Sequence, residues 1–116
     1  MAFEKEIALK DCNYRYAINP SVKRYTLKDT TFSETKLGHY ELSRLLEEVP
    51  NSGEGFLLKI IIHKDLTSFK LTITDKSGLR LVNIFKSEKH KILQDKFYFL
   101  MNSLVERNIF TKEANA

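Results

Sequence analysis

Residues 87–108, with the sequence SEKHKILQDKFYFLMNSLVERN, decide the fold because they carry the one long helical pattern in the chain. Apolar side chains recur there at steps of three and four residues, so they share one stripe that another apolar surface must cover. Ser87 is a favourable N-cap residue, and Asn108 can take the left-handed position that ends a helix. About 20 residues at roughly 1.5 Å each give a rod of about 30 Å, which spans a small domain. The stripe consists of Leu93, Phe97, Leu100, Met101, Leu104 and Val105.

Three stretches before this helix have strand patterns. Residues 56–63, FLLKIIIH, are apolar on both faces and predict a central strand. Residues 68–74 and 79–85 alternate between apolar and polar side chains, which is typical of half-buried strands. Together the three stretches predict a meander whose apolar face packs on the helix.

The loop at residues 76–78 sets the register of the last two expected strands. Gly78 can supply the left-handed residue of a three-residue hairpin loop, which pairs Asp75 with Leu79. This register gathers the large apolar side chains on one face, and a slip of one residue would mix the two faces. The expected apolar face consists of Phe69, Leu71, Ile73, Leu79, Leu81 and Phe85.

The first half of the chain also predicts short strands. They are residues 3–9, 14–18, 25–35 and 39–45, the last two forming a hairpin around a turn at residues 37–38. The stretch 47–55 contains two glycines and a proline, and it is the segment that we expect to be most mobile. These strands either form a second layer or extend the meander, so the expected class is α+β.

Composition restricts the class of protein. A chain of 116 residues fits a single domain, 1–116, without a separate linker. Its one cysteine excludes an internal disulfide and fits a reducing compartment. The sequence contains no run of 18 apolar residues, which a membrane-spanning helix would need. We therefore expect a soluble, cytoplasmic protein. The second half, residues 59–116, carries 11 Lys and Arg against 6 Asp and Glu, which favours an anionic partner.

Common signatures of catalysis and cofactor binding are absent from the sequence. It contains no glycine-rich nucleotide motif, no zinc-protease motif and no nucleophile elbow. Cys12, His39, His63 and His90 have no spacing typical of metal ligands, so the sequence predicts neither a metal nor a cofactor. A cysteine nucleophile that meets a distant histidine in space stays open.

Two basic surfaces are candidates for anion binding. At the start of the helix, free backbone N–H groups and the positive end of the helix dipole would lie beside several basic side chains. A nucleic-acid surface on the polar face of the meander is less favoured, because its aromatic side chains fall on the apolar face instead. The candidates at the helix start are Ser87, Lys89, His90 and Lys91. Those of the meander are Lys59, His63, Lys70, Thr72 and Arg80.

Five blocks of sequence resemble a known family. They are MAFEK at the start, YTLKDTTFSETKLGHYELSRLL, KDLTSFKLTIT, GLRLVNIFK and LVERNIFT. In combination they resemble a small protein family of lactic-acid bacteria that is catalogued as a domain of unknown function. The resemblance implies two antiparallel sheets, with about six to eight short strands, packed against a single long helix. It also implies a role in amino-acid metabolism, with a suggested link to cysteine and sulfur handling beside a cysteine desulfurase.

The fold that this resemblance implies is remotely similar to prokaryotic S-adenosylmethionine decarboxylases, which form a pyruvoyl group by cleaving a Glu-Ser bond. None of the eight serines in this chain follows a glutamate. The sequence therefore does not support pyruvoyl chemistry, because shared architecture alone does not carry function.

These observations favour a non-catalytic binding or accessory protein of cytoplasmic amino-acid metabolism. A protein partner would bind at the hairpin, because strands can hold mixed donors, acceptors and an aromatic ring in place. A small anionic metabolite is the other expected partner, at the start of the long helix. A small enzyme acting on an amino acid or its derivative is the alternative, with nucleic-acid binding less favoured. The hairpin candidates are Glu34, Thr35, Lys36, His39, Tyr40 and Arg44.

Overall fold

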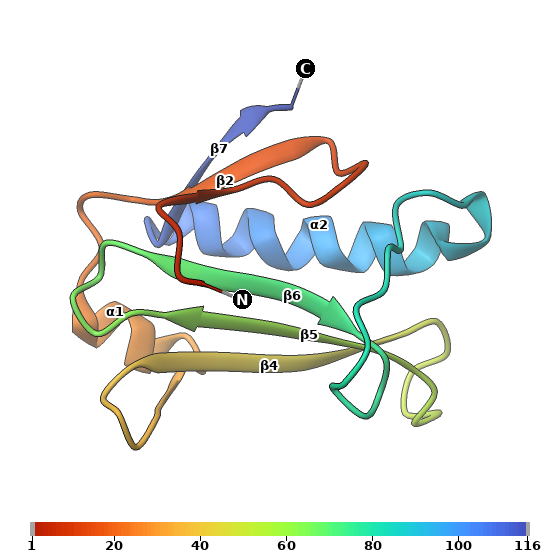
Figure 1. Cartoon of the computed structure of the whole chain (residues 1–116), viewed down its shortest axis with the longest axis horizontal. Helices are drawn as coiled ribbons and strands as arrows, with labels where there is room; N and C mark the ends of the chain where they lie inside the picture. Colours follow the sequence, from red (N-terminus) through yellow and green to blue (C-terminus); the bar gives the residue numbers. More distant parts are fainter. Residues whose placement is uncertain (1, 116) are drawn as a thin grey trace.

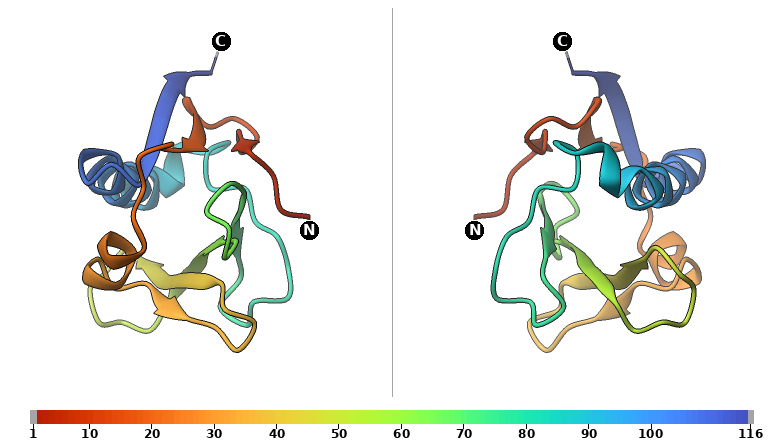
Figure 2. Two further views of the ribbon diagram at one scale, coloured as in Figure 1. Left: turned by 90° about the vertical axis from the view of Figure 1, so that its left-hand side faces the viewer. Right: turned by 90° about the vertical axis from the view of Figure 1, so that its right-hand side faces the viewer.

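Two antiparallel sheets and one long helix build the fold in a computed structural model that describes residues 2–115 (Figure 1). The strands of the first sheet lie in the order β1-β2-β7, and those of the second in the order β3-β4-β5-β6. Figure 2 shows helix α2 at one side of the space between the sheets and the segment 75–86 at the opposite side. The elements in chain order are β1 (Glu6–Ile7), β2 (Tyr14–Ile18), α1 (Arg24–Asp29), β3 (Ser33–Glu34), β4 (Tyr40–Glu47), β5 (Gly55–Ile62), β6 (Phe69–Thr74), η1 (Glu88–His90), α2 (Lys91–Glu106) and β7 (Phe110–Ala114).

The predicted long helix and its caps are confirmed. It begins with the short 3-10 turn η1, where the side chain of Ser87 accepts a hydrogen bond from the backbone N–H of Lys89, and continues as α2. Asn108 has a φ of 62°, and the N–H of Ile109 donates to the carbonyl of Leu104 at 3.0 Å. This left-handed cap satisfies a terminal carbonyl and turns the chain into β7. The buried side chains of α2 are Leu93, Phe97, Met101 and Leu104.

The strand prediction is confirmed for β2, β4, β5 and β6, but the meander is built from β4, β5 and β6. The N-terminal strands β1 and β2 form a separate sheet, as one of the two expected alternatives had it, and β7, which the sequence did not predict, completes that sheet. Of the expected strand 3–9, only β1 and an isolated bridge between Glu4 and Phe69 are formed. The aromatic rings of Phe69 in β6 and Phe110 in β7 lie 5.0 Å apart, so the two sheets share one core.

The first arm of the predicted hairpin was wrong. Residues 24–29 form helix α1, and only β3 remains of the expected strand 25–35. The reason is that this segment has one side chain to bury: Leu27 is 0% exposed, whereas Tyr25 is 66% exposed. A short helix buries Leu27 and satisfies its own backbone, and the Thr30 hydroxyl donates to the carbonyl of Thr26 at 2.8 Å.

The predicted register of residues 79–85 was also wrong. The N–H of Asp75 donates to the carbonyl of Arg80 at 2.8 Å, and one bridge joins Thr74 to Leu81. The loop therefore contains one more residue than expected, and residues 79–85 form no strand beyond this bridge. Phe85 nevertheless packs on the core, as predicted, with its ring 5.2 Å from that of Phe97. Leu79 is 90% exposed, Leu81 is 65% exposed, and Ile84 is 0% exposed.

Candidate functional site

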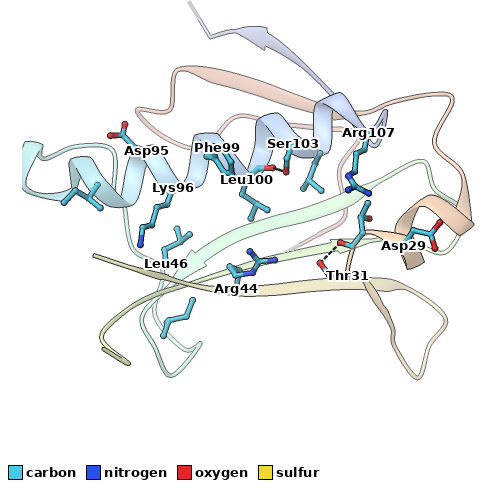
Figure 3. Close-up of a pocket in the computed structure, with 14 residues that line it drawn as sticks. Asp29, Thr31, Arg44, Leu46, Asp95, Lys96, Phe99, Leu100, Ser103 and Arg107 are labelled. Atoms are coloured by element: carbon cyan, nitrogen blue, oxygen red, sulfur yellow. Dashed lines mark hydrogen bonds between the residues drawn. The ribbon is translucent and has the colours of Figure 1, made fainter. Parts of the chain in front are cut away.

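A groove of about 780 Å³ lies between the end of α1, strand β4 and helix α2 (Figure 3). Its volume lies within the range of about 300–1,000 Å³ that small-molecule sites occupy. We call it the groove and define it by Asp29, Thr31, Arg44, Lys96, Phe99 and Arg107.

One wall of the groove is a stripe of α2 next to the buried stripe. Ile92, Lys96, Phe99, Ser103 and Arg107 follow one another at steps of three or four residues, so they share one helix face. Phe99 is 78% exposed and Ile92 is 46% exposed. This face of α2 is therefore apolar in its middle, has a cation at Arg107, and is not covered by either sheet.

The floor of the groove contains a charged side chain where an apolar one is expected. Alternation along β4 places Arg44 on the same face as Leu42 and Leu46, which are each 3% exposed. β3 pairs only with the first two residues of β4, so it ends before Arg44. Figure 3 shows the guanidinium group of Arg44 directed toward α2.

The third side of the groove is the end of α1. Thr31 there has a φ of 72°, and the N–H of Phe32 donates to the carbonyl of Leu27 at 3.2 Å. This is a left-handed helix end with a β-branched residue at the position that glycine prefers. The Asp29 carboxylate lies at the same end of the groove (Figure 3).

Most polar side chains of the groove already have partners. The Asp95 carboxylate lies 3.2 Å from the Lys91 ammonium, and the Lys96 ammonium donates to the carbonyl of Glu47. The Ser103 hydroxyl donates to the carbonyl of Leu100 at 2.7 Å, within the same helix. Arg44 and Arg107 are different, because neither guanidinium has a hydrogen bond or an ion pair within residues 2–115.

His39 lies away from the groove in a cluster of rings. Its centroid is 4.6 Å from that of His63 and 5.0 Å from that of Phe3, and its Nδ1 accepts from the N–H of Lys64 at 3.0 Å. Partial burial, followed by the positive charges of His63, Lys64 and Lys70, lowers the pKa of His39 below its ordinary value, while Asp65 opposes the shift. The cluster favours a neutral His39.

The hairpin candidates do not form one surface. Arg44 lies in the groove, whereas Glu34 and Lys36 are exposed near the turn at the other end of β4. Thr35 shapes this turn, because its side chain accepts from the N–H of His39 at 3.1 Å. Tyr40 is 4% exposed and belongs to the core.

The candidates at the start of the long helix are likewise engaged in local contacts. Ser87 caps η1, and Lys91 forms an ion pair with Asp95 in the next turn of α2. The ring of His90 meets that of Phe56 edge-on at 5.4 Å, and Lys89 is exposed. Anion binding at this turn stays a prediction.

Cys12 is 4% exposed and lies among tyrosines rather than in the groove. Burial raises the pKa of Tyr98 to about 12, with Cys12 and Tyr14 adding to the shift, and burial also raises the pKa of Tyr16. Within residues 2–115 no group of three or more His, Cys, Asp or Glu side chains is arranged to hold a metal ion. No helix in that range has the length and apolarity needed to cross a membrane.

Sequence reasoning found Arg44 but missed the rest of the groove. Two signals were available: Arg44 interrupts the apolar alternation of β4, and Phe99 is a large apolar residue outside the buried stripe of α2. Asp29 and Thr31 interrupt the alternation of the strand expected there, which indicated a bulge or bend but no binding site.

Comparison with known proteins gives a family and a related structure. Residues 1–111 match the model of the DUF1831 family, which is described as "Putative amino acid metabolism". The crystal structure of a DUF1831 family protein from Lactobacillus plantarum is 30% identical with a TM-score of 0.89, and the match covers 97% of this chain and 99% of that chain. A search of curated proteins gave no match. Because the family model spans nearly the whole sequence, the chain belongs to the DUF1831 family.

Proposed function

We propose that this protein is a non-catalytic binding protein of cytoplasmic amino-acid metabolism and that it binds an amino-acid derivative in the groove. The observation that carries the proposal is the groove itself, a concave site with an apolar wall and two arginines that have no partner within residues 2–115. A concave site of this volume suits a small molecule, whereas docking of a protein usually uses a flatter apolar patch. The family description supports the connection with amino-acid metabolism.

The lining of the groove supports binding more than turnover. No histidine or cysteine lines it, and the Ser103 hydroxyl is bonded to its own helix. Nucleophilic catalysis needs a hydroxyl or thiol within reach of a base, and this lining does not provide that pair. Cys12 is buried elsewhere, so the proposal includes no sulfur chemistry at this thiol.

The test is a binding screen of the purified chain against amino acids and their acylated and phosphorylated derivatives. Thermal shift identifies ligands, because a compound that binds the folded state raises its melting temperature. Amide chemical shifts then map each ligand, and we expect changes in residues 44–46 and 96–107. We expect Ser103→Trp, which fills the groove, to weaken binding at least tenfold.

The matched control is Glu106→Trp, which places the same side chain on an exposed position of α2 outside the groove. It should bind as the wild type does. Ligands whose chemical shifts map elsewhere, or the absence of any ligand, would refute the proposal. Conversion of a bound compound by the wild type would establish the enzyme alternative, and retention of a protein partner that Ser103→Trp does not affect would establish an accessory role on another surface.

A further inference from the structure

Arg44 comes from β4 and Arg107 from the end of α2, and both side chains line the groove. Figure 3 shows Arg107 extending from the end of α2 and Arg44 extending from β4 into the space between them. No carboxylate lies within 4.0 Å of either guanidinium in the described chain. Both guanidinium groups are exposed and keep their N–H donors free for an anion in the groove.

The position of Arg44 strengthens this observation. Alternation places it on the same face of β4 as the buried Leu42 and Leu46, yet Arg44 itself is exposed and lines the groove. A guanidinium offers five N–H donors in a planar fork that matches the oxygens of a carboxylate or phosphate. Two such forks on opposite walls can surround one oxyanion group from both sides.

The remainder of the groove is suited to an apolar chain. From Arg107 the helix stripe continues through Phe99 and Leu100 back to Lys96, which is 11 residues away and therefore about 16 Å along the axis. Leu46 lies opposite on β4. The Lys96 ammonium, held at the carbonyl of Glu47, marks the far end of this apolar stretch.

We infer that Arg44 and Arg107 form a clamp for the oxyanion group, a carboxylate or a phosphate, of an elongated amphipathic ligand whose apolar chain lies along Phe99, Leu100 and Leu46. The inference rests on the proposed function and specifies its ligand class. Acylated amino acids have this chemistry, because acylation removes the ammonium group that the two arginines would repel and adds an apolar chain.

Four probes separate the parts of the inference. Octanoylglycine has the carboxylate and the chain, octyl phosphate replaces the carboxylate by a phosphate, octanoylglycine methyl ester removes the charge, and glycine removes the chain. Titration calorimetry should give the tightest binding for one of the first two, and that probe identifies the preferred oxyanion. The methyl ester and glycine should each bind at least tenfold more weakly than that preferred probe.

The variants Arg44→Gln and Arg107→Gln should each weaken binding of the anionic probe at least tenfold and leave binding of the ester unchanged. Arg44→Lys keeps the charge but loses the fork, so it should fall between the wild type and Arg44→Gln. Arg80→Gln, which removes an exposed arginine outside the groove, is the matched control and should bind as the wild type does.

Stability of the free protein provides a second readout. Added sulfate should raise the melting temperature of the wild type more than that of Arg44→Gln, because the variant has lost one of the two guanidinium groups that bind the anion. Binding of probes in the groove that is insensitive to both arginines would overturn the clamp and leave the proposed function standing. If no ligand binds in the groove, both the clamp and the proposed function are overturned. If Arg44→Gln dimerises and binds the probes as the wild type does, the clamp is overturned and Arg44 protects a strand edge instead.

Discussion

His39 connects the N-terminal segment to the turn after β5 through one ring. Its Nδ1 must be unprotonated to accept the hydrogen bond of 3.0 Å from the N–H of Lys64. The carbonyl of Lys64 in turn accepts from the guanidinium of Arg24, in helix α1, at 2.8 Å. Protonation of one imidazole therefore disturbs contacts among three separate segments of the chain.

We predict that the protein loses stability as the pH falls from 7 to 5. The pKa of His39 is lower in the folded state than its ordinary value, so the unfolded state binds more protons in this range. The contribution of His39 is complete above the ordinary histidine pKa of about 6.5 and is lost as the pH falls toward the lower folded value. Melting temperatures measured across this range should decline less steeply for His39→Asn than for the wild type.

Asparagine is the informative replacement because its side-chain oxygen can accept the bond from Lys64 but does not titrate. His90→Asn is the control, since His90 contacts Phe56 away from this cluster, and it should keep the wild-type slope. Equal slopes for the wild type and His39→Asn would show that the ring cluster does not sense pH.

The groove shows how far single residues could be predicted. Arg44 was a candidate because it lies in the strand that follows a clear turn. Arg107 and Phe99 were not among the candidates. Their meeting depends on how α2 crosses β4, which is a matter of tertiary packing that neither segment encodes alone.

At the scale of elements, the register of residues 75–86, the segment after β6, can be tested directly. Ile84 is 0% exposed, whereas Leu79 is 90% exposed on the opposite side of the loop. We predict that Ile84→Ala lowers the free energy of unfolding by about 2–5 kcal/mol, because it leaves a cavity in the core. Leu79→Ala should change it by less than about 0.5 kcal/mol, as exposed substitutions usually do.

Urea unfolding followed by circular dichroism measures both changes. The three-residue loop expected from the sequence would place Leu79 on the apolar face and Ile84 on the polar one. If Leu79→Ala lowered the free energy of unfolding more than Ile84→Ala does, the three-residue loop would be the correct register. The Asp75 side chain favours the longer loop, because it accepts hydrogen bonds from the Ser77 hydroxyl at 2.6 Å and from the N–H of Leu79 at 3.3 Å.

The elements that bury the most side chains had the clearest patterns, although β2 was also predicted with only Tyr16 buried. α2 buries four, and β5 and β6 together bury seven residues, so their periodicity is visible in the sequence. α1 buries only Leu27, and β7 buries only Phe110. A single apolar residue has no period, and β7 becomes a strand because β2 is there to pair with it.

At the scale of the whole molecule, the two ends of the chain complete the same sheet. β2 is the middle strand, with β1 on one side and the C-terminal β7 on the other. Tyr14 pairs with Ala114, so this contact closes a loop of almost the full chain. Pairing at such separation is slow to form, because the entropy of loop closure is lost before any contact compensates it.

The shared core nevertheless predicts that both sheets unfold together. Phe110 of β7 contacts Phe69 of β6, and Phe97 of α2 contacts Tyr16 of β2 with ring centroids 6.1 Å apart. We predict that Phe110→Ala lowers the free energy of unfolding by about 3–5 kcal/mol. Native-state hydrogen exchange should show the same loss of protection at Tyr16, in β2, as at Ile60, in β5, because a global opening exposes both amides.

Thr111→Ala, at the exposed neighbouring position in β7, is the matched control and should leave both amides protected. A loss confined to Tyr16 would show that β1, β2 and β7 open as a separate unit. That result would also concern the groove. Its walls come from α1, β4 and α2, so they would stay folded when the smaller sheet opens. Equal losses would instead mean that the site exists only when the two ends of the chain are paired.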